Sequence, residues 1–457
     1  MSDPKRIVLW HGYLLTGSGS NIYTAALARE WRNAGHDVLL LCQEKRAGDF
    51  DFVDAHGDAQ RDNRGWRVAP TTAIDSPGRC VVVRPDIAGL LPVYVWDAYE
   101  GFEVKRFVEL SDEELDRYTE ANLDALVTAI ELHDPDAIVV GHEVMGPAIA
   151  RKACAATKTR YLAKLHGSAL EYAVKLQDRY RRHAFEGLSG AAVVTAGSRY
   201  MIEEASSVIP GWKERAVVVN PGCDVQLFRP RPRADSAPPT VGYVGKLIAA
   251  KGPQDLIAAL GLTRSPGLRA VVVGFGTLEQ RLRELAESLA TGDVGRALTI
   301  ASVGESGAPL GSVLRFLRSK LIDDRYLERV AAVPIDFLGR LDHGPLATVL
   351  PTFDVLVVPS VVPEAFGMVA AEAAACGVLP IVPRHSGIGE VGATLEAEMG
   401  EPGLLTFDPR TPIEGIALAI DRVLSLPVGR RAELGSVAVE VARRRWSWRV
   451  VAERLLA

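Results

Sequence analysis

The chain has 457 residues, 48% of them hydrophobic, so it is long enough for two or three domains of roughly 100–200 residues and is neither a peptide nor a disordered tail. Its 52 lysines and arginines against 57 aspartates and glutamates give a net charge of −5, which excludes an overall cationic field for nucleic acid or an anionic membrane. The five cysteines form no CxxC pair, and no apolar run reaches the roughly 18–20 residues that span a bilayer. We therefore expect a cytoplasmic protein without a disulfide framework, a structural zinc site or a transmembrane segment.

The first half of the chain alternates short apolar runs with helical stretches. A strand at 6–10 is followed by a glycine-rich loop at 12–20, a helix at 21–34 and a second strand at 38–41. The other elements predicted in this half are a helix at 112–132, a strand at 137–140, a helix that contains residues 149–156 and a strand at 160–165, and then a further helix and a strand at 191–195. This alternation is typical of a doubly wound parallel sheet, so residues 1–232 are predicted to form one Rossmann-like α/β domain.

A proline-rich stretch between Phe228 and Thr240 separates this half from a second alternating series. The second series predicts strands at 241–244, 269–273, 335–338, 355–358 and 379–382. Residues 233–440 are therefore predicted to form a second Rossmann-like domain. Because ligands of open α/β sheets bind beyond the carboxyl ends of the strands, we expect the functional site in a cleft where the two domains face each other.

Two glycine-rich loops follow predicted strands. The loop from Gly17 to Asn21 also precedes a helix, where backbone N–H groups favour a phosphate, although a tight turn would need glycine equally. The dinucleotide-binding fingerprint G-x-G-x-x-G requires a small residue at its third glycine position, and Ile22 occupies that position here. In the loop Gly274-Phe-Gly276 the third position is Glu279. Both loops therefore disfavour a nicotinamide dehydrogenase.

Two lysines follow the strand predicted at 241–244. Lys246 and Lys251 lie beside Gly245 and Gly252, and two ammonium groups with permissive backbone suit a diphosphate. The alternative is a pair of solvated lysines. Because they lie at the end of a strand in a chain of negative net charge, the binding role and the solvated alternative are weighed equally.

The segment from Pro359 to Gly377 is the most informative part of the sequence. It leaves a strand, crosses a loop that holds Glu364, and enters an alanine-rich helix that holds Glu372. Two acids placed in this way can hold opposite ends of an elongated polyhydroxy ligand, while free N–H groups at 366–369 accept its oxygens. The alternative makes Glu364 a helix N-terminal charge and Glu372 a surface residue. The small apolar residues around Glu372 argue against that alternative, because an unpaired buried carboxylate is costly.

This segment resembles the E-x7-E signature of the retaining glycosyltransferases of family 4, which have the GT-B architecture. Other parts resemble family segments in the same order: the second half at 220–230, 244–252, 337–341 and 386–391, and the first half more thinly at 17–21, at His166-Gly167 and at 446–456. The last of these resembles a helix that returns to the first domain, which implies that residues of about 441–457 pack there.

The resemblance implies a role for each matching residue. Glu364 would bind hydroxyls of the donor sugar and Glu372 those of the ribose. The backbone would hold the sugar at Phe366, Gly367 and Met368 and meet a phosphate at Val369. 

Further donor contacts are implied around the diphosphate. Lys246, which stands where arginine is usual, and Lys251 would neutralise the diphosphate with help from the Gly19 backbone. Backbone near Leu341 would recognise the base, and His166 would lie beside the transferred sugar.

The implied function is the retaining, front-side transfer of a sugar from a UDP- or GDP-type donor to a hydroxyl-bearing acceptor, which could be a small molecule, a glycan or a lipid-linked molecule. Fixed cations and hydroxyl-binding groups would stabilise the transition state, and no protein nucleophile is obligatory. Asn21, Tyr94 and His142 are candidates for the acceptor side. The rival functions are a GT-B epimerase or phosphorylase and a catalytically silent nucleotide-sugar sensor.

We expect no catalytic metal and no cofactor besides the co-substrate. No cluster of ligands has metal-binding spacing, and the D-x-D of Asp49-Phe-Asp51 lies in a polar loop of the wrong fold. Two connections are unusually long. Residues 45–108 are predicted to be an acceptor-side element, and residues 291–333 a decorated connection with a surface helix at 314–321 and no assigned role.

Overall fold

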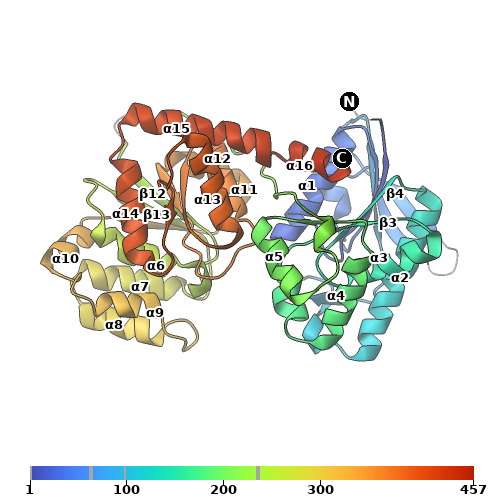
Figure 1. The fold of residues 1–457 in the computed structure, drawn as a ribbon, viewed down its shortest axis with the longest axis horizontal. Coiled ribbons are helices and arrows are strands. Elements are labelled where there is room, and N and C mark those ends of the chain that lie inside the picture. Colours follow the sequence, from blue (N-terminus) through green and yellow to red (C-terminus); the bar gives the residue numbers. More distant parts are fainter. Residues whose placement is uncertain (1–2, 61–64, 97–98, 233–236) are drawn as a thin grey trace. The chain divides into compact units, whose positions relative to one another are not determined.

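The computed structural model describes residues 3–60, 65–96, 99–232 and 237–457. It divides into two compact units. Unit 1 comprises Met1–Pro221 and Trp448–Ala457, and unit 2 comprises Gly222–Ser447 (Figure 1). The division precedes the proline-rich stretch at which we expected it, and residues 233–236 of that stretch lie outside the described part of the chain.

Unit 1 is built on a mostly parallel sheet. In the described residues this sheet has nine strands in the order β11-β10-β9-β8-β1-β2-β5-β3-β4, and only the β3–β4 pair is antiparallel. The strands are β1 (Arg6–Trp10), β2 (Asp37–Leu41), β3 (Ala55–Gln60), β4 (Gly65–Pro70), β5 (Arg79–Arg84), β8 (Ala137–Gly141), β9 (Leu162–Lys164), β10 (Val193–Ala196) and β11 (Ala216–Val218). A separate pair is formed by β6 (Leu90–Val93) and β7 (Glu103–Arg106).

Helices cover this sheet. They are α1 (Gly19–Asn33), α2 (Asp112–His133), α3 (Gly146–Thr157), α4 (Asp178–Gly190), α5 (Arg199–Val208) and α16 (Trp448–Leu456). The last helix belongs to unit 1 because it packs on α1, where the indole N–H of Trp31 donates to the carbonyl of Ala452 at 3.0 Å. Lys5 adds a bond to the carbonyl of Leu456 at 2.7 Å.

Unit 2 has a second, fully parallel sheet of six strands in the described residues, in the order β14-β13-β12-β15-β16-β17. The strands are β12 (Thr240–Val244), β13 (Arg269–Val273), β14 (Ile335–Gly339), β15 (Val355–Val357), β16 (Leu379–Pro383) and β17 (Thr406–Phe407). The helices are α6 (Pro253–Ala259), α7 (Glu279–Ala290), α8 (Val294–Val303), α9 (Gly311–Leu317), α10 (Asp324–Ala331), α11 (His343–Val349), α12 (Met368–Ala375), α13 (Ser386–Met399), α14 (Pro412–Leu424) and α15 (Val428–Val441).

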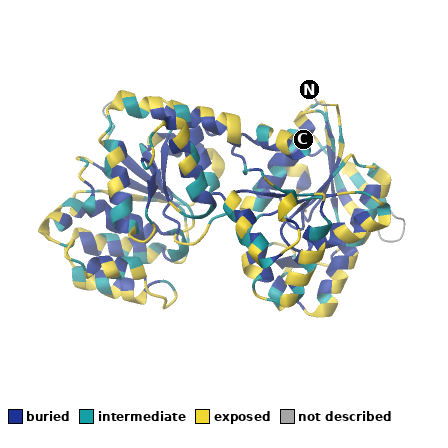
Figure 2. Ribbon diagram, viewed as in Figure 1, coloured by how far each residue is buried: buried dark blue, intermediate teal, exposed yellow. Residues whose placement is uncertain are grey.

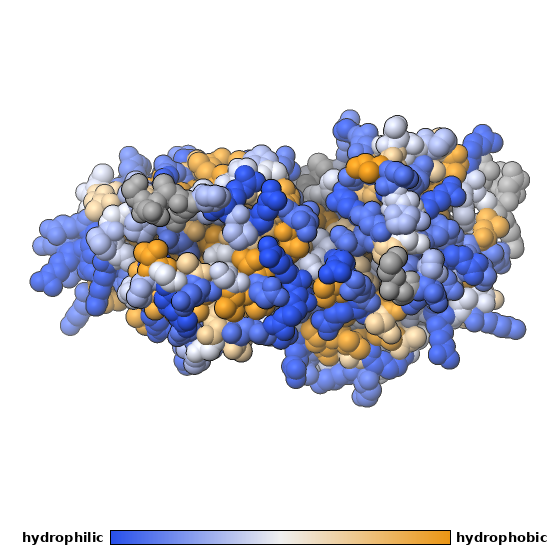
Figure 3. Space-filling view, turned by 90° about the horizontal axis from the view of Figure 1, so that it is seen from above, coloured by the Kyte–Doolittle hydropathy of each residue, from blue (hydrophilic) through white to orange (hydrophobic). Residues whose placement is uncertain are grey.

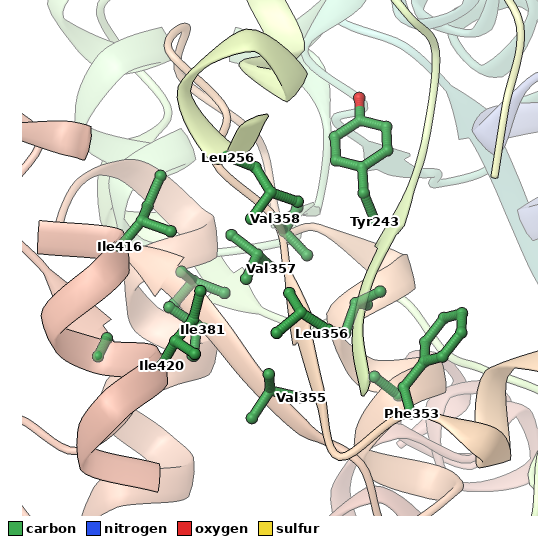
Figure 4. Close-up of a cluster of buried hydrophobic side chains, with 14 of the residues drawn as sticks. Tyr243, Leu256, Phe353, Val355, Leu356, Val357, Val358, Ile381, Ile416 and Ile420 are labelled. Carbon is green, nitrogen blue, oxygen red and sulfur yellow. The ribbon is translucent and has the colours of Figure 1, made fainter. Parts of the chain in front are cut away.

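The core of unit 2 lies between its sheet and its helices. Side chains of β15 and β16 pack against those of α6 and α14, among them Val357, Ile381 and Ile416 (Figure 4). The central strands of both sheets are buried, and helices expose their outer faces (Figure 2). Hydrophilic side chains cover much of the face seen in Figure 3. The α/β architecture with two Rossmann-like parallel sheets predicted from the alternating pattern is confirmed.

The two long connections are more structured than we expected. Residues 291–333 form α8, α9 and α10, whose side chains Ala301, Phe316 and Tyr326 join the core of unit 2. The surface helix predicted at 314–321 is wrong in extent, because α9 occupies Gly311–Leu317. Residues 45–108 supply three strands of the main sheet and the β6–β7 pair.

No helix in the described ranges is both long enough and apolar enough to cross a membrane. All five cysteines are buried, and none forms a disulfide.

The packing of β12 yields a test of the core. Gly242 lies between Val271 and Leu356 of the neighbouring strands, and a Cβ atom there would stand 2.1 Å from the ring of Phe353. We expect Gly242→Ala to lower the free energy of unfolding by about 1–3 kcal/mol through overpacking. Gly429→Ala on α15, where a Cβ meets nothing within 4 Å, should change it by less than about 1 kcal/mol. Urea unfolding of both variants checks this, and equal stabilities would contradict it.

Candidate functional site

A glycine-dependent turn follows β12 in unit 2. The turn η5 (Ala249–Lys251) is followed by Gly252, whose φ of +75° lies in the left-handed region. A Cβ on Gly252 would stand 2.1 Å from the carbonyl oxygen of Pro359, so only glycine allows this approach. Val361 donates its N–H to the carbonyl of Ala250 at 3.0 Å, which fastens the loop after β15 to the same turn. The two loops are therefore fastened to each other.

The two predicted ionic residues of these loops meet. The ammonium of Lys251 lies 2.6 Å from Oε1 of Glu364, and their side chains are 33% and 17% exposed. The hydroxyl of Ser360 also donates to this carboxylate oxygen, and the N–H of Glu364 donates to the hydroxyl of Ser386 at 3.0 Å. Glu364 is thus fixed at two points: its backbone N–H is bonded to Ser386, and its carboxylate oxygen is bonded to Ser360 and Lys251. Because Lys251 stays partly exposed, an anion can contact it.

Helix α12 begins at the same place. Gly367 precedes it with a φ of +92°, and a Cβ there would stand 2.9 Å from the side chain of Ile388. The first N–H groups of a helix have no partner within it, so those of Met368 and Val369 are available to oxygens of a ligand. Glu372 lies about one turn further along and is 8% exposed.

His343 faces Glu372 from the first residue of α11. Its Nε2 lies 3.7 Å from Oε1 of Glu372, and the interaction with that carboxylate raises the pKa of His343 above its ordinary value. Sequence reasoning missed this residue, although it follows β14 by only a few positions, as a site residue at the end of a strand would.

A cavity of about 300 Å³ joins these groups. Of the predicted residues it is lined by Gly245, Lys251, Glu364, Gly367, Met368, Val369 and Glu372, and it is also lined by His343 and Ser360. We call it the unit 2 pocket.

Three predicted residues of unit 2 do not line this pocket. Lys246 is exposed in the turn after β12, where its carbonyl accepts a bond from the hydroxyl of Tyr243. The side chain of Phe366 packs in the core, with its ring 5.8 Å from that of Trp446. Leu341 is half-buried against the same core.

In unit 1 the predicted residues gather at the carboxyl ends of β1, β8 and β9. The ring of His142 lies 4.9 Å from that of His166, 5.8 Å from that of His11 and 4.9 Å from that of Tyr94. Asn21 reaches the cluster because its Oδ1 is hydrogen-bonded to Nε2 of His11 at 2.9 Å. His11 was not predicted, although it follows a strand in the same way as His142 and His166. We call these five residues the histidine cluster.

The histidines of this cluster are uncharged near neutral pH. Burial lowers the pKa of His11 to about 4 and lowers the pKa values of His142 and His166 well below the ordinary value. His142 has a φ of +72°, which is a strained conformation for a residue other than glycine. Neither of its ring nitrogens has a hydrogen-bond partner in the described residues. Such neutral rings can still hydrogen-bond and stack on a ligand.

Glu143 holds the loop that carries His166. Its Oε1 accepts a bond from the N–H of Gly167 at 2.6 Å. Burial raises the pKa of Glu143 to about 7, although backbone N–H groups of the loop, Gly167 first among them, oppose the shift. Lys164, which donates to the carbonyl of Val219 at 2.7 Å, is also buried, and burial lowers its pKa to about 7. Glu143 was missed because its partners lie more than twenty positions away.

The last predicted donor residue, Gly19, is the first residue of α1. Ser18 caps this helix by accepting a bond from the N–H of Asn21. The D-x-D pair is engaged elsewhere in unit 1, since Asp51 pairs with Arg29 at 2.9 Å and Asp49 with Arg46 at 2.7 Å. Within the described ranges, no group of three or more His, Cys, Asp or Glu residues is arranged to hold a metal.

Two family models match the chain. The model of a glycosyl transferase 4-like domain matches residues 18–222, and the model of glycosyl transferases group 1 matches residues 321–440, so that together they match more than half of the chain. The chain is also similar to the D-inositol 3-phosphate glycosyltransferases of Mycobacterium tuberculosis and Mycobacterium bovis, with 27% identity over 285 residues. That match covers 58% of this chain and 50% of each relative, so the chain matches about half the length of these relatives.

Two solved structures share the fold over almost the whole chain. The sucrose-phosphate synthase of Thermosynechococcus elongatus has 19% identity and a TM-score of 0.57, covering 98% of this chain and 96% of that one. The HepE protein of Anabaena, solved with UDP-glucose, has 15% identity and a TM-score of 0.58, covering 99% and 98%. The GT-B fold is therefore shown.

The buried carboxyl of Glu143 yields a pH-dependent prediction. A raised pKa means that the folded state binds more protons than the unfolded state between pH 4.5 and about 7, so this group lowers stability as the pH rises through that window. We expect the fall in unfolding free energy from pH 5 to pH 7 to be smaller in Glu143→Gln, which cannot ionise. The exposed Glu120→Gln serves as the control. Urea unfolding at pH 5, 6 and 7 measures this, and parallel curves for wild type and Glu143→Gln would contradict it.

Proposed function

This chain belongs to the family 4 glycosyltransferases of GT-B fold, and we propose that it transfers a sugar, with retention, from a nucleoside-diphosphate sugar to a hydroxyl-bearing acceptor. The observation that carries this proposal is the unit 2 pocket, in which an ammonium, two carboxylates and the start of α12 surround one cavity. The HepE neighbour was solved with UDP-glucose, which supports a nucleotide sugar as the donor.

Lys251 is proposed to bind the diphosphate. Its ammonium is compensated by Glu364, and a diphosphate brings more negative charge than one carboxylate, so it competes for this cation. When the anomeric C–O bond breaks, negative charge grows on the departing diphosphate, and a fixed cation stabilises it. In this proposal Lys246 adds a second, exposed positive charge, and the Gly19 backbone a further contact. The proposal includes no metal ion.

The two carboxylates are proposed to bind hydroxyls. Glu364 would accept bonds from the sugar, and Glu372 with His343 would hold the ribose, while the N–H groups of Gly367, Met368 and Val369 would bind sugar and phosphate oxygens. By resemblance to the family, backbone near the half-buried Leu341 is proposed to bind the base, and the backbone at Phe366 to bind the sugar.

The histidine cluster is proposed to serve the acceptor and the transferred sugar. Uncharged rings at His142, His166 and Tyr94 offer hydrogen bonds and apolar faces, which suit a hydroxyl-rich molecule. In the front-side step the acceptor oxygen forms a bond to the anomeric carbon on the face from which the diphosphate leaves. The acceptor proton passes to a departing phosphate oxygen. The unpaired, buried thiols support a reducing compartment such as the cytoplasm.

Glu305 positions the turn that carries Lys251. Its Oε2 accepts a bond from the N–H of Ala249 at 2.8 Å, and its Oε1 accepts one from the hydroxyl of Thr277. Glu305 lies between α8 and α9, in the long connection to which the sequence assigned no role. The connection therefore supports the proposed diphosphate site from outside the lining of the unit 2 pocket.

The proposed donor site is tested with Lys251→Ala and Glu364→Gln. We expect each to lower turnover, measured as release of nucleoside diphosphate with a panel of hydroxyl acceptors, by at least about a hundredfold, because each removes a charged contact to the transition state. A UDP- or GDP-sugar should raise the melting temperature of the wild type and should raise that of Lys251→Ala less.

The matched control is Lys320→Ala, which removes an exposed positive charge elsewhere in unit 2. Near-normal turnover in both site variants would refute the assigned roles. Donor binding without turnover by the wild type on any acceptor would refute the transferase and favour a nucleotide-sugar sensor.

The positioning role of Glu305 predicts a graded effect. Glu305→Ala should weaken nucleoside-diphosphate binding by roughly tenfold, because the turn loses a charge-assisted bond, whereas Glu305→Gln keeps an acceptor and should lose less. Calorimetric titration with UDP and GDP measures this. Melting temperatures of both variants separate the effect from unfolding, and equal affinities of Glu305→Ala and wild type in folded protein would contradict it.

A further inference from the structure

A strongly basic pocket lies in unit 1, away from every residue used so far. The cavity has a volume of about 570 Å³ and is lined by the side chains of Arg151, Lys158, Arg160 and Arg215. No acidic residue is among its described lining residues. This concentration of positive charge stands out because the chain as a whole has a net charge of −5.

The pocket lies at the amino edge of the sheet. Arg160 precedes β9, Ala191 precedes β10 and Arg215 precedes β11, while Lys158 caps the carboxyl end of α3. Arg151 lies in the middle of α3, and its side chain reaches Gly190 at the end of α4. The histidine cluster lies at the opposite edge, where β1, β8 and β9 end. The basic pocket is therefore separate from the proposed transfer site.

The four cations are not neutralised by carboxylates. Among the described residues none of them forms an ion pair, and the guanidinium of Arg215 donates only to backbone carbonyls, that of Gly211 at 2.9 Å and that of Ala191. Helices α3 and α4 both end here, and each carboxyl end carries about half a negative charge. Two such ends offset about one of the four positive charges, so most of the positive charge is left for another partner.

One wall of the pocket is shaped to hold an arginine. The side chain of Arg151 lies over Gly190, where a Cβ atom would stand 2.4 Å from Cδ of Arg151 and 2.9 Å from the hydroxyl oxygen of Tyr161. Tyr161 is buried, and its hydroxyl donates to the carbonyl of Gly187. A side chain at position 190 would force Arg151 or Tyr161 to shift. Glycine at this position therefore lets the Arg151 side chain lie against the end of α4 in the observed conformation.

We propose that this pocket binds a phosphate-bearing anion at the edge of unit 1 remote from the transfer site. Guanidinium groups pair with phosphate oxygens through two parallel bonds, and three arginines with a lysine can compensate a group that carries two or more negative charges. A soluble phosphorylated molecule and the headgroup of an anionic lipid both carry this chemistry.

The test uses pyrophosphate as the soluble probe and the full-length chain. We expect Arg151→Ala combined with Arg160→Ala to weaken pyrophosphate binding at this site by at least about tenfold, measured by calorimetric titration. The control removes two exposed charges nearby through Lys152→Ala combined with Arg182→Ala and should leave binding unchanged. Lys251→Ala should lose only the binding of the proposed donor site and keep this one, so failure of the proposed function is distinguishable.

A second arm identifies the source of the phosphate. Co-sedimentation with vesicles of phosphatidylglycerol, but not of phosphatidylcholine, that is lost in the Arg151→Ala and Arg160→Ala variant would support a lipid headgroup. Pyrophosphate binding without vesicle binding would support a soluble ligand. If the variant binds pyrophosphate and both vesicles as the wild type does, the proposal is overturned. A lower melting temperature with no change in binding would likewise assign these residues to the helix ends alone.

Discussion

The ion pair between Lys251 and Glu364 links two neighbouring loops of unit 2. The strands before these loops, β12 and β15, are neighbours, so the loops leave the same edge side by side. Adjacency alone does not bring a lysine to 2.6 Å from a carboxylate. That distance requires the close approach of Gly252 to Pro359 and the bond from Val361 to Ala250. Glycine at 252 is therefore a condition for the charge arrangement, because any other residue would separate the loops and their charges.

The composition of α12 is suited to close packing. Apart from Glu372 this helix is Met, Val and Ala, and its small side chains allow it to pack closely against β16 and α15. Close packing buries Glu372 to 8% exposure, and burial of a carboxylate is costly without a partner. His343 is that partner from across the pocket. The helix thus holds one charged group at a defined depth in an otherwise apolar surface, which is what selective binding of hydroxyls requires.

The sequence predicted the parts of this arrangement whose signal lies in a short stretch of neighbouring residues. Strands, the E-x7-E segment and the lysine after β12 each have a pattern within a few residues, and seven predicted residues line one pocket. The run Cys80–Val83 was overlooked inside the long segment at 45–108, although it carries the same apolar signal as its neighbours and forms β5. Glu305 had no such signal. Glu305 is bonded to Ala249, 56 positions away, and only the folded chain brings the two together. Residues that position other residues depend on such distant contacts, so local sequence patterns predict pocket-lining residues more readily than the residues that support them.

The carboxyl ends and the amino ends of the strands in unit 1 differ in charge, and the parallel topology gives part of the reason. In a parallel sheet wound by helices, every strand ends at one edge, and the helices begin there with the positive ends of their dipoles. At that edge unit 1 places His11, His142 and His166, which burial keeps uncharged. At the other edge the helices end, and a modest number of basic residues would balance their negative ends. Four cations around two helix ends exceed that balance. A fold that required only compensation would place fewer charges there, because unpaired like charges repel one another and lower stability. Arg151, Lys158 and Arg160 are exposed, so this excess of positive charge is accessible to an external anion, as the proposed site requires.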